Sequence, residues 1–494
     1  PYGIGTIDQP LVAALRAKHG FVRLFALAGK VVVIDEVHAY DLYMADLMDV
    51  LLGWLAALNC RVVLLSATLP AKRREQLLRA WGYTGQLPAS QYPSITWITP
   101  HGRAKSRTFD VEARKPLTLS LLPPAMDREG WQTGAETILR LVREHGGQGA
   151  LVLNTVRDAQ LAYDWLAGQD LGAVELDLFH ARFTVRDRET IERRVLSRFG
   201  KDGKRHRPAI LVATQVVEQS LDLDFDHMVT ALAPIDLLIQ RAGRLHRHRR
   251  NREGQLLTKG RDERPDPVLH ILSPPSDEQA VPELREPMYA DDVMLRTHRY
   301  LQQSPRIIRA VADVSQAVEA VYGPLDAATA SEAWLRAYAE AERKAGMQSH
   351  RVEDAVRDAV IPSAWGRTLI TFRRQFLDDD ENSEARTAAR TRLEDMPSVT
   401  LVLLPPGKSV PPHEPTWQEK RSWVLQSVRT PAMGKALAEL LELPVPGPWR
   451  RIGALRFARP VVLDEKGYFW TSSYEYRYSL QRGLEKRARK EGTP

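Results

Sequence analysis

Val31-Val-Val-Ile-Asp-Glu-Val-His38 joins a run of apolar, mostly β-branched residues to two carboxylates and a histidine. Such a run is typical of a buried parallel strand. Carboxylates that follow a strand of this kind lie at the sheet edge where α/β folds bind ligands. Asp35 can hold Mg²⁺ through its water shell, and Glu36 can orient a water molecule toward a phosphate. The stretch therefore predicts a nucleotide-driven enzyme, against the alternative of a carboxylate-rich helix N-terminus.

The overall composition is that of an ordinary globular protein. The 494 residues are 44% hydrophobic and 27% charged, which leaves room for about three or four domains. A net charge of +7 permits a polyanionic partner, but 69 basic against 62 acidic residues is a mild excess that leaves this open. No apolar run reaches about 18 residues, so no transmembrane helix is expected. The single cysteine, Cys60, excludes an internal disulfide and favours a cytoplasmic location.

Two regions of the chain each alternate strand and helix patterns, which predicts two parallel sheets in tandem. The first region covers residues 1–115, and Pro1 carries neither a basic leader nor a methionine, so we expect a chain that begins inside this domain. Helices are expected at 41–58 and 71–81, and a strand at 61–65.

The second region, 116–285, is expected to follow a connector at 114–124 that ends in two prolines. Its expected strands are 150–153, 175–179, 209–213, 228–232 and 268–272. Residues 249–264 are very polar and predict a loop. Residues 286–395 predict a mostly helical region, and 396–494 a small α+β domain with proline clusters.

Three further motifs follow expected strands. Ser66-Ala67-Thr68 could relay between a nucleotide and a second domain, or simply cap a helix. Gln240-Arg-Ala-Gly-Arg-Leu-His-Arg247 spaces its arginines by three, which predicts that they lie on one face of a helix or turn and can clamp phosphoryl oxygens, against a solvated basic loop. Thr214 and Gln215 could meet a nucleic-acid backbone, and Asp222 a ribose or a magnesium-bound water, against a plain strand-to-helix loop. The joint occurrence of these motifs favours the functional interpretation.

This set of motifs resembles the superfamily 2 helicases. Asp35-Glu-Val-His38 is similar to their motif II, Ser66 to Thr68 to motif III, and Gln240 to Arg247 to motif VI. The sequence from Thr214 to Asp222 resembles more closely the CRISPR-associated helicase–nuclease of type I systems. That resemblance extends over residues 4 to about 250 and includes Leu178-Phe-His-Ala-Arg-Phe183. It implies an α/β fold with two tandem RecA-like parallel-sheet domains, the first one incomplete, then a helical linker region and a small α+β C-terminal domain.

The resemblance also implies roles. It implies an ATP- and Mg²⁺-dependent translocase on single-stranded DNA, recruited by a crRNA-guided surveillance complex and paired with an HD nuclease. Asp35 would hold Mg²⁺, Glu36 would activate water, and Ser66 and Thr68 would couple the domains. The other implied sites are the arginine fingers Arg244 and Arg247, the nucleotide contacts His38, Asp222, Gln240 and Arg241, and the DNA contacts Thr6, Thr155, Thr214 and Gln215.

Two departures limit the resemblance. No Gly-x-x-x-x-Gly-Lys-Ser/Thr phosphate loop is present, since Gly29-Lys30 runs directly into Val31. None of the 13 histidines precedes an aspartate, so the nuclease motif is also absent. We expect both elements to lie before Pro1 in a longer protein. Two alternatives remain: a generic superfamily 2 helicase, or a catalytically incomplete remnant that binds DNA or a partner.

Overall fold

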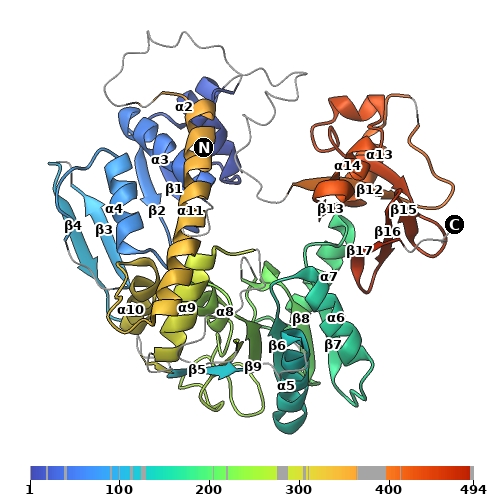
Figure 1. The fold of residues 1–494 in the computed structure, drawn as a ribbon, viewed down its shortest axis with the longest axis horizontal. Coiled ribbons are helices and arrows are strands. Elements are labelled where there is room, and N and C mark those ends of the chain that lie inside the picture. The colour runs from blue at the N-terminus through green and yellow to red at the C-terminus, as the bar shows by residue number, and fades with distance from the viewer. Residues whose placement is uncertain are drawn as a thin grey trace. The chain divides into compact units, whose positions relative to one another are not determined.

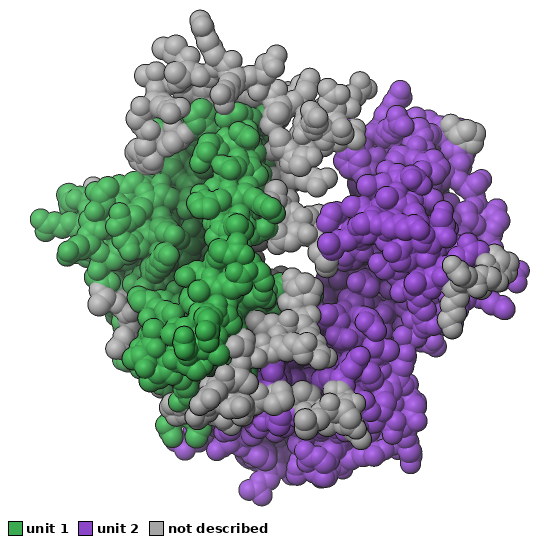
Figure 2. All heavy atoms as spheres, viewed as in Figure 1, with its two compact units in different colours: residues 1–114, 234–236, 277–393 green, residues 115–233, 237–276, 394–494 purple. Residues whose placement is uncertain are grey.

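The computed structural model folds into two compact units, coloured separately in Figure 2. Unit 1 comprises residues 1–114, 234–236 and 277–393, and unit 2 comprises residues 115–233, 237–276 and 394–494. The structure describes residues 2–17, 20–37, 42–88, 92–99, 101–111, 115–123, 129–203, 205–218, 221–274, 288–303, 307–309, 311–362, 364, 397–411 and 413–489.

Unit 1 is built on a short parallel sheet. Strands β1 (Val31–Ile34) and β2 (Arg61–Leu64) pair in parallel, with Val31 opposite Arg61 and Ile34 opposite Leu64. The crossover between them is helix α3 (Leu42–Ala57), whose leucines and methionines from Met44 onward are buried. Helix α4 (Ala71–Ala80) follows β2. The strand–helix–strand order predicted for this region is confirmed. An apolar helix connects the two strands because the apolar face of their sheet has to be covered.

The sheet of unit 1 is covered on one face only. Val31 and Val33 are 63% and 60% exposed, and Val63 and Leu65 are also exposed. Their neighbour Ile34 is buried among residues of α3. The prediction of fully buried strands is therefore wrong for β1 and β2, since alternate side chains point to opposite faces and only one face carries a helix layer in the part of the chain that the structure describes.

The helical region after residue 286 belongs to the core of unit 1. Helix α11 (Glu332–Ala359) packs on α3, where Val352, Val356 and Ala359 join the same apolar cluster as Leu47 and Leu51 (Figure 1). The remaining unit 1 elements are α1 (Asp8–Leu11), η1 (Val12–Ala14), α2 (Gly20–Leu27), the hairpin β3 (Ser94–Ile98) and β4 (Ala104–Thr108), α9 (Asp291–Gln303), β11 (Ile307–Ile308) and α10 (Val311–Tyr322).

Unit 2 contains a wide, fully parallel sheet. Its strands lie in the order β5-β10-β9-β6-β8-β7. They are β5 (Leu117–Leu122), β6 (Gln148–Val152), β7 (Glu175–Phe179), β8 (Ala209–Ala213), β9 (His227–Ala231) and β10 (Val268–Leu272). Every residue of β6 and β8 is buried, as the apolar runs predict for strands covered on both faces. The helices are α5 (Gly130–His145), α6 (Val156–Ala167), α7 (Val185–Phe199) and α8 (Ile235–Ala242).

One predicted connector is a strand. Leu117–Leu122 forms β5, which pairs in parallel with β10, so that Thr118 lies opposite Val268. The expectation of an irregular linker over 114–124 is wrong there. The alternating Leu-Thr-Leu-Ser-Leu pattern suits a strand, but its partner lies far along the chain.

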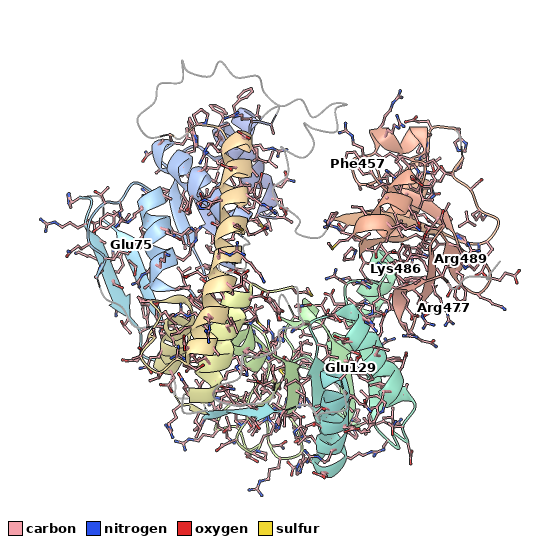
Figure 3. All side chains as sticks on the ribbon, in the orientation of Figure 1. Glu75, Glu129, Phe457, Arg477, Lys486 and Arg489 are labelled. Atoms are coloured by element: carbon pink, nitrogen blue, oxygen red, sulfur yellow. The ribbon has the colours of Figure 1, made fainter. Side chains whose placement is uncertain are left out.

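The last hundred residues form a small α+β domain that packs within unit 2 (Figure 1). It has two three-stranded sheets, ordered β13-β12-β14 and β15-β16-β17. The elements are β12 (Ser398–Leu404), α13 (Trp417–Leu425), β13 (Ser427–Pro431), α14 (Gly434–Glu442), η5 (Gly447–Arg451), β14 (Arg459–Val462), β15 (Tyr468–Trp470), β16 (Tyr474–Ser479) and β17 (Gly483–Ala488). The predicted α+β class is confirmed. Arg477 and Lys486 project from its last two strands (Figure 3).

Within unit 2, this domain contacts the part that holds the parallel sheet through the Leu178–Phe183 stretch noted in the sequence. The buried ring of His180 bonds the carbonyl of Arg482 at 3.0 Å, and the amide of Leu484 donates to the carbonyl of Arg182 at 2.8 Å. Burial lowers the pKa of His180 to about 3, so the ring stays neutral. His180 therefore has a structural role in this contact.

No helix within the described ranges combines the length and apolar character needed to cross a membrane.

Candidate functional site

Asp35 and Glu36 directly follow β1 and are both exposed. The Glu36 amide donates to Asp35 Oδ1 at 2.9 Å, and Glu36 has φ of 54°, in the left-handed region that a residue with a side chain rarely adopts. Such strain is frequent at functional positions. The turn thus presents two adjacent carboxylates at the carboxyl edge of the sheet.

Ser66 and Thr68 lie beside these carboxylates, because the ends of β1 and β2 are bonded together. Leu65 donates its amide to the Ile34 carbonyl at 2.9 Å, and Val37 donates to Leu65 at 3.1 Å. Ser66 Oγ donates to the carbonyl of Thr68 at 2.9 Å. The structure therefore brings the predicted motifs II and III together within unit 1.

Two other unit 1 predictions concern His38 and Thr6. His38 lies outside the described residues. Thr6 is exposed just before α1, and its carbonyl accepts the Gln9 amide at 3.1 Å. Its DNA contact stays a prediction.

In unit 2, the predicted polar residues converge at the ends of β6 and β8. Thr214 is buried, and its amide donates to the Phe179 carbonyl. Gln215 Nε2 donates to the carbonyl of Asn154 at 2.9 Å. Thr155 caps α6, since its Oγ1 accepts the amide of Asp158 at 3.0 Å. The Thr155 hydroxyl thus already has a local structural task.

Arg241 is fully buried, and each of its nitrogens is bonded within unit 2. Nε donates to Glu218 at 2.7 Å, and a terminal nitrogen donates to Asn154 Oδ1 at 3.1 Å. The other terminal nitrogen meets Thr230 Oγ1 at 2.7 Å and the carbonyl of Ala231 at 3.1 Å. In this structure the guanidinium ties the ends of β6, β8 and β9 together, and the nucleotide contact of Arg241 stays a prediction.

Arg241, Arg244 and Arg247 have different surroundings, instead of the shared face of a helix or turn that was predicted. Helix α8 ends at Ala242, and His246 has φ of 45°, so the chain turns sharply. Arg244 donates to the carbonyls of Val217 and Glu218, at 3.2 and 2.8 Å. Arg247 remains on the surface with a side chain 37% exposed. Arg244 and Arg247 therefore hold separate positions.

Asp222 joins Arg247 and His248. Its Oδ1 lies 2.7 Å from Arg247 Nε and 2.8 Å from His248 Nε2. Burial alone would raise the pKa of Asp222, but the hydrogen bond from His248 and the charges of His248 and Arg247 lower it. Asp222 is thus held ionised next to the surface arginine.

Gln240 presents a different situation. Its side-chain nitrogen is buried and meets no hydrogen-bond partner among the residues that the structure describes. A buried unpaired donor is costly, so this amide has capacity for a further contact.

The sequence analysis missed Asn154 as a shared anchor and missed Asp224 and Asp226 entirely. Asp224 is fully buried among arginines. The signal was available in Leu221-Asp-Leu-Asp-Phe-Asp226, whose strict alternation places all three aspartates on one side of an extended segment.

The comparisons with known proteins converge. A family model described as the C-terminal part of the CRISPR-associated nuclease/helicase Cas3 matches residues 145–250. A CRISPR-associated endonuclease/helicase Cas3 of Thermus thermophilus is 34% identical over 93% of this chain and 54% of its own length. A crystal structure of a CRISPR-associated protein matches 99% of the chain and 54% of its own, with 33% identity and a TM-score of 0.83. The chain is of the Cas3 helicase type.

Other Cas3 proteins agree. The Escherichia coli Cas3 is 42% identical over 50% of this chain and 28% of its own length. The T. fusca Cas3–AMPPNP structure matches 98% of the chain and 57% of its own, with 29% identity and a TM-score of 0.79. The predicted family and the RecA-like α/β class are therefore confirmed. The chain spans about half the length of the first of these Cas3 relatives.

Proposed function

We propose that this chain supplies the water-activating carboxylates and the second RecA-like domain of an ATP-driven translocase on single-stranded DNA in type I CRISPR interference. The main support is the turn after β1, where Asp35 and Glu36 lie exposed beside Ser66 and Thr68. Relatives named Cas3 nuclease/helicase match most of the chain, and T. fusca Cas3 has been solved with ATP and ADP.

The carboxylates fit a nucleotide-bound Mg²⁺ better than a protein-bound one. No cluster of three or more metal-ligating side chains occurs among the described residues. Mg²⁺ at phosphate-transfer sites is typically held by one or two carboxylates together with substrate phosphates and water. Asp35 would meet such an ion, which neutralises phosphate charge when bound. Glu36 would orient the attacking water and accept its proton.

The second RecA-like domain would contribute cationic groups that bind phosphate. Arg244 and Arg247 are the candidate phosphoryl contacts, and Gln240 and Asp222 the candidate nucleotide contacts. Thr214, Gln215, Thr155 and Thr6 are the candidate contacts to DNA phosphates. Such contacts bind largely without regard to sequence and weaken as salt rises.

A structure named as a CRISPR RNA-guided surveillance complex before nicking matches 98% of this chain and 60% of its own, with 30% identity and a TM-score of 0.76. We therefore propose recruitment by such a complex as the cellular setting.

The test is Glu36→Gln in the natural gene product that carries this chain. We expect ATP hydrolysis stimulated by single-stranded DNA to fall by about 100-fold or more, because the amide cannot accept the proton of water. DNA affinity should stay within twofold. The matched control is Glu75→Gln on α4 of the same unit, an exposed glutamate paired with Arg79 (Figure 3). Unchanged turnover in Glu36→Gln would contradict the role of Glu36.

A further inference from the structure

Residues 221–226 form an extended segment with two chemically different sides. Leu223 bridges to Gly200, and Phe225 bridges to Leu245. Leu221, Leu223 and Phe225 are buried. Because side chains alternate along extended backbone, Asp222, Asp224 and Asp226 share the opposite side.

Asp224 and Asp226 lie in a buried cluster of balanced charge, which we call the aspartate–arginine cluster. Asp224 lies 2.5 Å from Arg250, 3.2 Å from Arg264 and 3.3 Å from Arg205. Asp226 lies 2.8 Å from Arg264 and 2.9 Å from Arg205. The cluster's members are Asp224, Asp226, Asp262, Arg205, Arg250 and Arg264, three charges of each sign.

The cluster holds the main chain of Arg247 and His248 from both sides. The Arg247 amide donates to Asp224 Oδ1 at 3.0 Å. The His248 carbonyl accepts from a terminal nitrogen of Arg264 at 2.5 Å. Phe225 adds two ladder bonds, since its amide donates to Arg244 at 2.8 Å and its carbonyl accepts from His246 at 3.0 Å. The segment that carries Arg244 and the surface residue Arg247 is therefore fixed at its backbone.

The side chain of Arg247 is not part of this cluster. It is 37% exposed and meets Asp222, whose own side chain is 47% exposed. A buried, charge-assisted network that fixes a peptide while leaving the following guanidinium on the surface is suited to presenting that guanidinium to a ligand.

We propose that Asp224 is a positioning residue, which through the aspartate–arginine cluster holds Arg247 in the orientation that phosphoryl transfer requires. This inference rests on the proposed function. It assigns to residues 205, 224, 226, 250, 262 and 264 a role in turnover that lies beyond fold stability alone. Asp224 touches no substrate in this scheme and acts through the main chain of Arg247.

The test compares Asp224→Asn with a matched variant, Asp177→Asn. Asp177 on β7 is also a buried carboxylate paired with two arginines, Arg194 and Arg198, but it has no bond to residues 244–248. In the natural gene product, we expect Asp224→Asn to lower kcat for DNA-stimulated ATP hydrolysis about tenfold at unchanged KM. Asp177→Asn should keep kcat within twofold.

A double-mutant cycle separates positioning from general damage. If Asp224 acts through Arg247, adding Asp224→Asn to Arg247→Ala should cause no further loss of kcat. An equal loss of kcat in both backgrounds, or an equal loss in Asp177→Asn, would overturn the proposal. Where Asp224→Asn does not fold, Arg264→Lys takes its place, because lysine keeps the charge but loses the planar fork that spans Asp224, Asp262 and the His248 carbonyl.

A second readout needs no ATP turnover. Hydrogen exchange of the amides at 244–248 should accelerate about tenfold or more in Asp224→Asn and stay unchanged in Asp177→Asn. A wild-type protein without ATPase activity would refute the proposed function. The exchange result would still decide whether Asp224 fixes the backbone that carries Arg247. Equal exchange in the two variants would overturn the positioning proposal.

Discussion

The ends of the strands in unit 1 and unit 2 are organised in opposite ways. In unit 1, Asp35 and Glu36 lie exposed at the end of a two-stranded sheet covered on one face. In unit 2, Asn154, Glu218 and Arg241 lie buried at the ends of β6, β8 and β9, and bond one another. The difference teaches that chemistry and anchoring are separable. We therefore expect residues of the first kind to tolerate substitution with little loss of stability, and substitution of the second kind to be costly.

The largest effect is expected for Arg241→Met. It removes the cation that pairs with the buried Glu218, together with the bonds to Asn154 and Thr230, so we expect unit 2 to lose about 3–5 kcal/mol of unfolding free energy. Hydrogen exchange resolved along β6, β8 and β9 measures this for unit 2 alone. The matched control is Arg140→Met, which removes an exposed pair with Glu144 and should cost less than about 1 kcal/mol. A similar cost in both variants would break the comparison.

Acid should affect the stability of the two units in opposite directions, because the pKa of a partly buried carboxyl group is lowered in unit 2 and raised in unit 1. Burial alone would raise the pKa of Asp226, but the charge of Arg205 and the bond and charge of Arg264 lower it to about 2. A lowered folded-state pKa contributes stability above about pH 4, which is lost as the pH falls toward about 2. The contribution is on the order of 2 kcal/mol.

In unit 1, burial raises the pKa of Asp49, against the opposing effect of Arg73. Wild type should therefore gain stability at this site as the pH falls. Chemical denaturation across pH 2–6 gives the test. The unfolding free energy of wild type minus that of Asp226→Asn should fall on acidification. The unfolding free energy of wild type minus that of Asp49→Asn should rise. The same trend in both would refute the assignment.

A smaller effect is expected where the C-terminal domain docks. Gly483 has φ of +68°, and a Cβ there would meet the Arg182 carbonyl oxygen and lie 2.8 Å from His180 Cε1. Gly483→Ala should loosen this contact by about 1–2 kcal/mol. The control Gly407→Ala has φ of +71° with open space around it, so it carries the backbone strain alone. Faster amide exchange at 180–184 in Gly483→Ala only would support the docking role, and equal exchange would contradict it.

The smallest effect on stability is expected for Asp35→Asn. The side chain is exposed and accepts a bond from the neighbouring Glu36 amide, and an asparagine oxygen can also accept that bond. We expect the unfolding free energy of unit 1 to change by less than about 0.5 kcal/mol. Urea denaturation checks this. A loss comparable with that of Arg241→Met would show that unit 1 is anchored as strongly as unit 2.

Much of the fold could be predicted because local patterns carry it. The ranges expected for β7, β8 and β10 match the structure, since β8 is a short apolar run and β7 and β10 carry several apolar residues within five positions. Strand β5 was missed because its identity depends on pairing with β10, which is distant in sequence. The exposure of Val31 and Val33 was missed because an apolar run does not reveal how many faces of its strand are covered.

The site was predictable in its residues but less so in their contacts. Asp35, Glu36 and Ser66 come together because parallel strands end at one edge. Arg241, Arg244 and Arg247 look equivalent in sequence, yet one is buried, one binds carbonyls and one is on the surface. That division depends on where α8 ends and on the turn at His246, which spacing alone does not encode.

The alternation in Leu221–Asp226 makes this segment intolerant of any change in length. One inserted residue between Asp222 and Asp224 would reverse the facing of everything on one side of the insertion. Carboxylates would then point into the apolar layer, and leucine or phenylalanine would face the arginines of the cluster. Deletions would act in the same way. Loop grafts, fluorescent insertions and chimaeric junctions in unit 2 therefore need to avoid these six positions, although the segment is neither helix nor regular strand for most of its length.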